Sequence, residues 1–399
     1  MKIVKKKTLI GGALIMGSFS ALYFALPPLT ATIYDSSVPE TEKGMSTSTH
    51  EIKKEPEFVV THVKTPNVVK AIYMTQCVAG TRDFRARLVD LVDTTELNSI
   101  VIDIKDYSGR ISFRSDNPLL KDKLSPTCRA DDMMRFIGTL HEKGVYVIGR
   151  ITVFQDPYFS KMRPDLAIKK SSDKESVWKD KKGISYIDPG AHEAWEYIST
   201  LAKESYKIGF DEINFDYIRF PSDGNMQDIY FPWSAQALAQ DPAHGKATVL
   251  KNFFSYTSEQ LRSSIPNIVL SADLFGMTTT NTDDLNIGQV IENAALYFDY
   301  IAPMVYPSHY PPTFHGFKNP ADHPYEVVKF SMDSAVTRLN AASTTPLKLR
   351  PWLQDFNLGA VYTADMVRAQ TKATYDAGLT SWMLWNAGNT YTKGALENK

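Results

Sequence analysis

Short runs of apolar and β-branched residues recur along the chain from about residue 69 onwards, separated by longer stretches of helical periodicity. We predict strands at residues 71–75, 99–106, 146–154, 212–220, 268–276, 300–308, 349–356 and 378–386. Apolar residues three and four apart predict helices at residues 84–97, 130–144, 192–209, 248–264, 287–298, 325–342 and 364–378. Gly144, Gly209 and Gly378 stand between a helix and the next strand, where a left-handed C-cap is needed.

This alternation of strands and helices predicts the fold class. Strands separated by helices are parallel and are joined by right-handed crossovers. Eight such units favour a closed (β/α)₈ barrel of the TIM type, an α/β fold, over residues 69–397. The alternative is an open doubly wound sheet, but no glycine-rich nucleotide-binding motif follows any of the predicted strands.

The first residues of the chain follow a different pattern. Lysines cluster at the start, and an uncharged apolar stretch runs from Leu9 to about Leu29, so residues 1–31 are interpreted as a signal peptide or membrane anchor. The lysines place the N-terminus in the cytoplasm and the later residues outside it. The imperfect cleavage pattern around Ala31 favours an uncleaved anchor. Residues 32–68 are polar and predict a flexible linker.

Composition narrows the range of partners. Lys and Arg number 44 against 45 Asp and Glu, so no overall positive charge draws the protein to nucleic acid, which we exclude as a partner. Cys77 and Cys128 are the only cysteines. They either form a disulfide in an oxidising compartment or remain two thiols, and they resemble no zinc motif. We expect no cofactor and no bound metal.

Polar residues gather at the C-terminal ends of the predicted strands, which is where barrel enzymes place their active sites. Residues two apart in a strand share a face. Of residues 212–218, we therefore expect Ile213, Phe215 and Tyr217 to face the helices and Glu212, Asn214, Asp216 and Ile218 to face the barrel axis. In the next strand the same alternation turns Ser271 and Asp273 inward.

Two of these inward residues are candidates for catalysis. Neighbouring strands lie about 4.8 Å apart, which brings Asp216 and Asp273 close together. Glycosidic cleavage uses one carboxylic acid and one carboxylate, and an apolar wall from Phe275 and Tyr306 would keep one of the pair protonated. We predict Asp216 as nucleophile or base and Asp273 as acid. The predicted substrate-binding residues are Asp103, Lys105, Arg150, Asn214, Tyr306, Gln354, Asp355, Trp385 and Asn386.

The segments GRITVFQDP, FDEINFDYIRFP, LSADLFG, IAPMVYPSHY, LRPWLQDF and SWMLWNAGNTYT resemble the bacterial putative glycoside hydrolase family, from about Val69 to Leu396. The resemblance implies a catalytic TIM barrel without an established substrate. Chitinase-type barrels are more distantly similar, but Ile218 stands where their catalytic Glu belongs. The arrangement is also similar to that of α-amylase-type barrels, with Asp216 on the fourth strand and Asp273 in place of their usual strand-five Glu.

These observations lead to one hypothesis and two alternatives. The hypothesis is an extracytoplasmic glycoside hydrolase that acts on a cell-surface or environmental polysaccharide or oligosaccharide and is held at the membrane by its N-terminal segment. The first alternative is a non-catalytic carbohydrate-binding barrel, whose acids are too far apart or are paired with Lys105 or Arg150. The second is a metal-dependent hydrolase, with Asp103, Asp216 and Asp273 among the ligands.

Overall fold

The computed structural model describes residues 58–399. The signal peptide or anchor predicted at residues 1–31, and the predicted linker up to residue 57, lie outside the described residues. In residues 58–399, each helix is too short or too polar to cross a bilayer.

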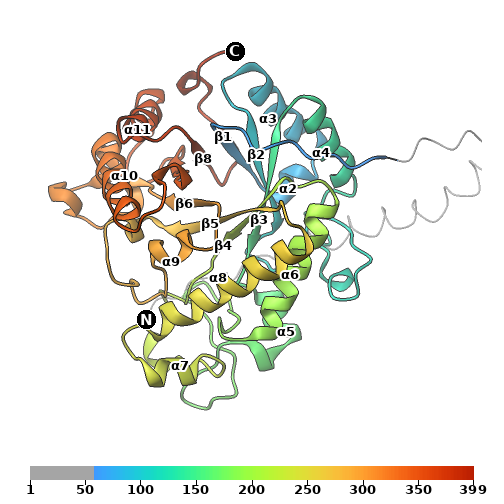
Figure 1. Cartoon of the computed structure of the whole chain (residues 1–399), viewed down its shortest axis with the longest axis vertical. Coiled ribbons are helices and arrows are strands. Elements are labelled where there is room, and N and C mark those ends of the chain that lie inside the picture. Colours follow the sequence, from blue (N-terminus) through green and yellow to red (C-terminus); the bar gives the residue numbers. More distant parts are fainter. Residues whose placement is uncertain (1–57) are drawn as a thin grey trace, which may run out of the picture. The chain divides into compact units, whose positions relative to one another are not determined.

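Eight parallel strands form a closed barrel in sequence order, with β1 paired to β8 (Figure 1). The strands are β1 (Lys70–Met74), β2 (Ser99–Lys105), β3 (Tyr146–Thr152), β4 (Glu212–Asp216), β5 (Val269–Phe275), β6 (Tyr300–Met304), β7 (Trp352–Gln354) and β8 (Trp382–Trp385). Each predicted strand has its counterpart, so the predicted (β/α)₈ barrel is confirmed and the open doubly wound sheet is wrong.

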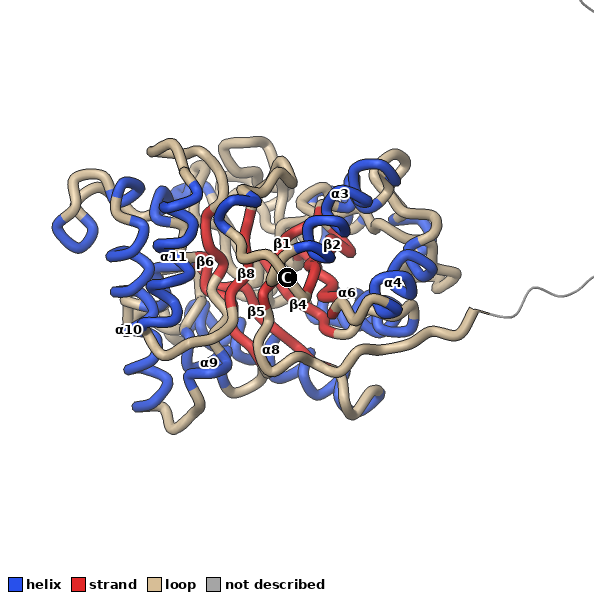
Figure 2. The backbone as a smooth tube through the Cα atoms, turned by 90° about the horizontal axis from the view of Figure 1, so that it is seen from above, coloured by secondary structure: helices blue, strands red, loops and turns tan. Residues whose placement is uncertain are grey.

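Helices surround the barrel (Figure 2). They are α2 (Gln76–Ala79), α3 (Arg82–Thr94), α4 (Met133–Glu142), α5 (Pro157–Met162), α6 (His192–Lys207), α7 (Ala235–Gln240), α8 (Gly245–Ser264), α9 (Ile291–Ala295), α10 (Pro324–Ala341) and α11 (Ala364–Asp376). The three predicted C-cap glycines all have positive φ. Helix α9 is shorter than predicted, because Gly288 has a φ of 83° and Val290 is extended. The short helices α2, α5 and α7 were not predicted.

Hydrophobic side chains form two layers, one on each side of the barrel wall. Ile213 and Phe215 belong to the outer layer, which packs beneath the helices. Tyr73, Tyr146 and Trp352 belong to the inner layer. Because the inner layer fills the barrel interior, a ligand site has to lie at one end of it.

The N-terminal end of the barrel is covered by residues 58–66. Asp211, just before β4, accepts hydrogen bonds from the backbone N–H groups of Val63 at 2.7 Å and Val147 at 2.8 Å. Its other close partner is Nε2 of His141, at 3.0 Å. The compact unit begins at Phe58, before the domain start that the sequence suggested at residue 69.

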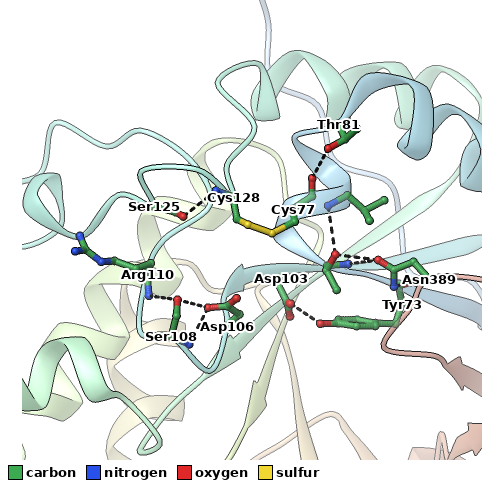
Figure 3. Close-up of a disulfide and its surroundings, with 12 residues drawn as sticks. Tyr73, Cys77, Thr81, Asp103, Asp106, Ser108, Arg110, Ser125, Cys128 and Asn389 are labelled. Atoms are coloured by element: carbon green, nitrogen blue, oxygen red, sulfur yellow. Dashed lines mark hydrogen bonds between the residues drawn. A yellow bond between two sulfur atoms is a disulfide. The ribbon is translucent and has the colours of Figure 1, made fainter. Parts of the chain in front are cut away.

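A disulfide joins Cys77 to Cys128, with their Cα atoms 4.1 Å apart (Figure 3). It links α2, which directly follows β1, to the long loop after β2, and it lies near the hydrogen bond from Tyr73 to Asp103. The bridge spans 51 residues, and constraining a loop of that length stabilises the fold by about 4 kcal/mol in the chain-entropy model. Of the two possibilities that the sequence left open, the disulfide is the one present.

Candidate active site

The side chain of Arg150, on β3, contacts three aspartates at the C-terminal end of the barrel. Its Nη1 donates to Oδ1 of Asp103 at 2.6 Å, and its Nε donates to Oδ2 of Asp216 at 3.1 Å. The same Nε lies 3.8 Å from Oδ2 of Asp273. The four side chains are at most 6% exposed. Strands β2, β4 and β5 thus each direct a carboxyl group to one guanidinium.

Asp216 and Asp273 are neighbours across two adjacent strands. The register pairs Asn214 with Ser271 and Phe215 with Ala272, so the next residues face the same end of the barrel. Because both Oδ2 atoms lie within 3.8 Å of one nitrogen, they are less than about 7 Å apart, which covers the carboxyl spacing of retaining glycosidases and only the short end of the inverting range. Both residues line a cavity of about 220 Å³.

The two carboxyl groups have different surroundings. Burial, followed by the charge of Asp216, raises the pKa of Asp273 well above its ordinary value. Its Oδ1 accepts hydrogen bonds from Nε1 of Trp352 at 2.8 Å and Nδ2 of Asn214 at 2.9 Å. Asp216 instead accepts from Nε and Nη2 of Arg150 and, at 2.5 Å, from the backbone N–H of Tyr217. Asp273 thus has a raised pKa that favours its protonated form, whereas Asp216 is hydrogen-bonded to a guanidinium and to a backbone N–H.

Aromatic side chains form the wall of the cavity opposite the acids. Tyr306 and Trp385, both predicted to bind substrate, line the cavity. The ring of Trp385 stacks on Tyr73 with centroids 3.9 Å apart, and the guanidinium of Arg150 lies 5.1 Å from the Trp385 centroid. Phe275 contributes the expected apolar surface. The cavity thus combines two acids with flat apolar faces.

Lys105, which the sequence predicted to bind substrate, does not line this cavity. It is fully buried, and its Nζ lies 2.5 Å from Oδ2 of Asp156. The pairing of β2 with β3 shifts register between Asp103 and Lys105, so the two side chains do not share a face as simple alternation requires. Asp156 also accepts the backbone N–H of Phe159 at the start of α5. The ion pair therefore holds the loop after β3.

Asp103 and Asn214 are hydrogen-bonded to neighbouring side chains of the site and do not line the 220 Å³ cavity. Asp103 accepts hydrogen bonds from Arg150 and, at 2.5 Å, from the hydroxyl of Tyr73. Burial raises its pKa to about 6 against the lowering effect of Arg150. Asn214 donates to Asp273. Both residues thus contact side chains of the site, and their predicted contact with substrate stays a prediction.

Three further predicted residues fix loops at the mouth of the barrel. Oε1 of Gln354 accepts the N–H of Ser308 at 3.1 Å. Oδ2 of Asp355 accepts the N–H of Thr392 at 2.8 Å. Oδ1 of Asn386 accepts the N–H of Gly388 at 2.8 Å. Gln354, Asp355 and Asn386 do not line the 220 Å³ cavity, because they satisfy backbone groups of the loops, and their predicted contact with substrate stays a prediction.

Alternation along β4 ends at Tyr217, which changes two expectations. Tyr217 has a φ of 52°, so its side chain turns into the cavity wall, whereas Ile218 packs in the outer hydrophobic layer. The sequence had predicted the reverse, with Tyr217 facing the helices and Ile218 facing the barrel axis. The sequence analysis also missed Arg219, Met304 and His309 as cavity residues. Their positions just after β4, in β6 and just after β6 are the only signal that could have identified them.

The metal-dependent alternative requires Asp103, Asp216 and Asp273 to act as ligands. The guanidinium of Arg150 lies within ion-pair distance of all three and places a positive charge where a metal ion would have to bind. Elsewhere in residues 58–399, no three His, Cys, Asp or Glu side chains are arranged to bind a metal. The three aspartates are therefore bound to an arginine, an arrangement that does not suit a metal site.

Residues 71–391 match the model of a protein family described as "Putative glycosyl hydrolase domain". The chain belongs to this family. Its barrel is a glycoside hydrolase domain, and the family of the enzyme indicates a polysaccharide or oligosaccharide as substrate. The resemblance that the sequence motifs carried, from about Val69 to Leu396, is confirmed over nearly the same range.

Solved structures share the architecture of this glycoside hydrolase domain. The domain of PgaB (BpsB) from Bordetella bronchiseptica is 14% identical, with a TM-score of 0.59, and the match covers 81% of this chain and 95% of that one. α-L-Fucosidase isoenzyme 2 from Paenibacillus thiaminolyticus is 13% identical, with a TM-score of 0.57 over 82% of this chain and 48% of that one. At these identities the likeness shows the fold alone.

A hypothetical protein from Ruminiclostridium thermocellum ATCC 27405 is 31% identical over 51% of this chain and 96% of that one, with a TM-score of 0.43. No protein of curated function matches the chain in sequence.

Proposed function

We propose that the domain cleaves glycosidic bonds with Asp273 as the general acid and Asp216 as the nucleophile or base. The observation that carries the proposal is that two carboxyl groups from adjacent strands line one cavity in unlike environments. Asp273 retains a proton that it can give to the leaving oxygen. Asp216, which accepts hydrogen bonds from Arg150, can attack the anomeric carbon or activate water. Tyr306 and Trp385 offer ring faces on which a pyranose can pack.

The non-catalytic alternative predicts acids paired with Arg150, and both Asp216 and Asp273 lie within ion-pair distance of it. The pairing also serves catalysis. The hydrogen bonds from Arg150 fix the orientation of the Asp216 side chain on the cavity that Asp273 also lines. Asp216 still lines the cavity, and the acids are close enough to act on one bond. We therefore favour catalysis over binding alone.

We propose further that the enzyme acts outside the cytoplasm on a cell-surface or environmental polysaccharide. The lysine-rich and apolar start of the sequence supports this location. The disulfide between Cys77 and Cys128 supports it independently, because disulfides persist in oxidising compartments.

A glycan panel tests the proposed reaction. The full chain is incubated with α- and β-linked glucans, galactans and amino-sugar polymers, and new reducing ends are measured. We expect release from at least one polymer, and we expect Asp216→Asn to lower the rate by about 10³-fold or more, because one of two required carboxylates is lost. If Asp216→Asn hydrolyses the polymer at the wild-type rate, Asp216 is not a catalytic residue. If the wild-type protein cleaves no polymer, the proposed reaction is contradicted.

A second test compares the pH dependence of kcat/KM in the wild type and in the variant Trp352→Phe. The indole N–H of Trp352 stabilises the charged form of Asp273 and so lowers its pKa. Trp352→Phe removes this donor, so the pKa of Asp273 rises and the acid keeps its proton to higher pH. We expect the basic limb of kcat/KM to move upward by roughly 0.5 to 1 pH unit. A limb that stays in place or moves downward would contradict the assignment of Asp273 as the acid.

A further inference from the structure

A second cavity lies beside the candidate active site. It has a volume of about 470 Å³ and shares two wall residues, Tyr217 and Arg219, with the cavity that contains the two acids. Its other walls come from loops after β2, β3 and β4, including Tyr107, Tyr186 and Asp223. These loops all follow the C-terminal ends of strands, so both cavities open at the same end of the barrel.

Hydrogen bonds hold the loops around the second cavity in a fixed arrangement. In the long loop between β3 and α6, antiparallel bridges join Ala167 to Ile187 and Lys179 to Ser185. Trp178 in this loop is 1% exposed and donates from Nε1 to the carbonyl of Asn225, in the loop after β4, at 3.0 Å. These contacts hold the two loops together, so the cavity is formed before anything binds.

The chemistry of this wall suits an uncharged sugar. Tyr107 is 62% exposed and presents an aromatic face to solvent. The charged residues are balanced, since Lys182 and Arg219 stand against Asp180 and Asp223. A phosphate-rich ligand would require a net positive surface, whereas a pyranose requires an aromatic face with hydrogen-bonding groups around it.

The shared wall is held in a costly backbone conformation. A φ of 52° is unfavourable for a bulky residue such as Tyr217, and such strain concentrates at functional sites. At this turn Asp216 contacts Arg150, and the side chain of Tyr217 forms part of the wall of both cavities. Arg219 lies 5.3 Å from the Tyr217 centroid, and its Nη1 donates to the carbonyl of Phe220 and to Oγ of Ser222, each at 3.1 Å.

We propose that the second cavity is a subsite for sugar units next to the bond that is cleaved, so that the substrate is a glycan chain bound across Tyr217 and Arg219. This inference rests on the proposed function. The 220 Å³ cavity alone is smaller than the roughly 300–1,000 Å³ of common ligand sites, whereas the two cavities together accommodate several rings.

Binding measurements test the subsite without requiring turnover. The full chain with Asp273→Asn is titrated by calorimetry with malto-, cello- and chito-oligosaccharides of two, four and six units. We expect affinity in at least one series to rise about tenfold from the dimer to the hexamer. Adding Tyr107→Ala should return the hexamer to the affinity of the dimer, because truncating a central aromatic contact costs about tenfold or more. Tyr375→Ala is the matched control, since Tyr375 is also exposed but lies on α11 near the N-terminal end of β8.

Two outcomes overturn the subsite: affinity that does not rise with length in any series, or a rise that survives Tyr107→Ala. Either can occur while the wild-type protein still cleaves polymers in the glycan panel, in which case the proposed function stands and only the subsite fails. If length-dependent binding is lost in Tyr107→Ala and kept in Tyr375→Ala, the subsite is supported even where no polymer of the panel is cleaved.

Discussion

Replacing Asp273 by Asn is expected to lower kcat for a natural glycan by about 10²–10⁴-fold, the contribution of a positioned general acid. For an aryl glycoside whose phenol is already acidic, the loss should be much smaller, because that leaving group departs without a proton. Asp216→Asn should lose activity on both substrates, because each requires the nucleophile or base. Steady-state kinetics of the two variants on both substrates measure the difference.

The structure makes this comparison feasible. The amide oxygen of an asparagine at position 273 can still accept the hydrogen bonds from Trp352 and Asn214, so the variant should fold normally. The reverse pattern, in which Asp216→Asn is spared on the activated substrate, would exchange the two roles. Equal losses for both variants on both substrates would show that Asp273 does not act as the acid.

Replacing Arg150 by Gln is expected to destabilise the fold by about 3–5 kcal/mol, because removing one partner of a buried ion pair leaves uncompensated charge. Here three buried aspartates lose their shared cation. Denaturant unfolding followed by circular dichroism measures the loss. Activity should fall as well, since Asp216 loses the hydrogen bonds from Arg150 that position it.

Arg219→Gln is the matched control, because Arg219 is half-buried and its Nη1 bonds to Phe220 and Ser222 are to neutral oxygens. We expect Arg219→Gln to lower the free energy of unfolding by less than about 1 kcal/mol.

The loss of stability caused by Arg150→Gln should also depend on pH. Arg150 restrains the pKa of Asp103, which burial raises to about 6, so its removal raises that pKa further. The folded variant then binds a proton that the unfolded chain releases, and its stability falls as pH rises from about 4 to 7. A difference in the free energy of unfolding between wild type and Arg150→Gln that is equal at pH 5 and pH 7 would contradict this account.

Much of the architecture could be predicted from the sequence because strand and helix periodicities are local properties. Alternation correctly turned Ile213 and Phe215 outward and Asp216 and Asp273 inward, and the parallel register then placed the two acids side by side. Gly288 shows the limit of periodicity, because the apolar spacing of residues 287–298 continues through a residue whose φ is 83° and so overestimates α9.

The errors at the site have two physical causes. Alternation requires regular strands, and it fails at Lys105 after a register shift and at Tyr217 after a left-handed turn, neither of which is visible in residue type. In addition, Gln354 and Asp355 are polar residues at strand ends, like Arg150, but they bind loop backbone. Which partner a polar side chain takes depends on loops distant in sequence, so residue type and position alone do not separate scaffold from site.

The chain enters the domain at Phe58 and passes over the N-terminal end of the barrel, where Asp211 holds the backbone of Val63. The acids and both cavities belong to the other end. Phe58 itself packs beside Gly138 on α4, outside both cavities, so a tag or solid support that joins the domain at this residue leaves the mouth open to a bulky polymer. Immobilised protein should accordingly keep full access to high-molecular-weight glycans.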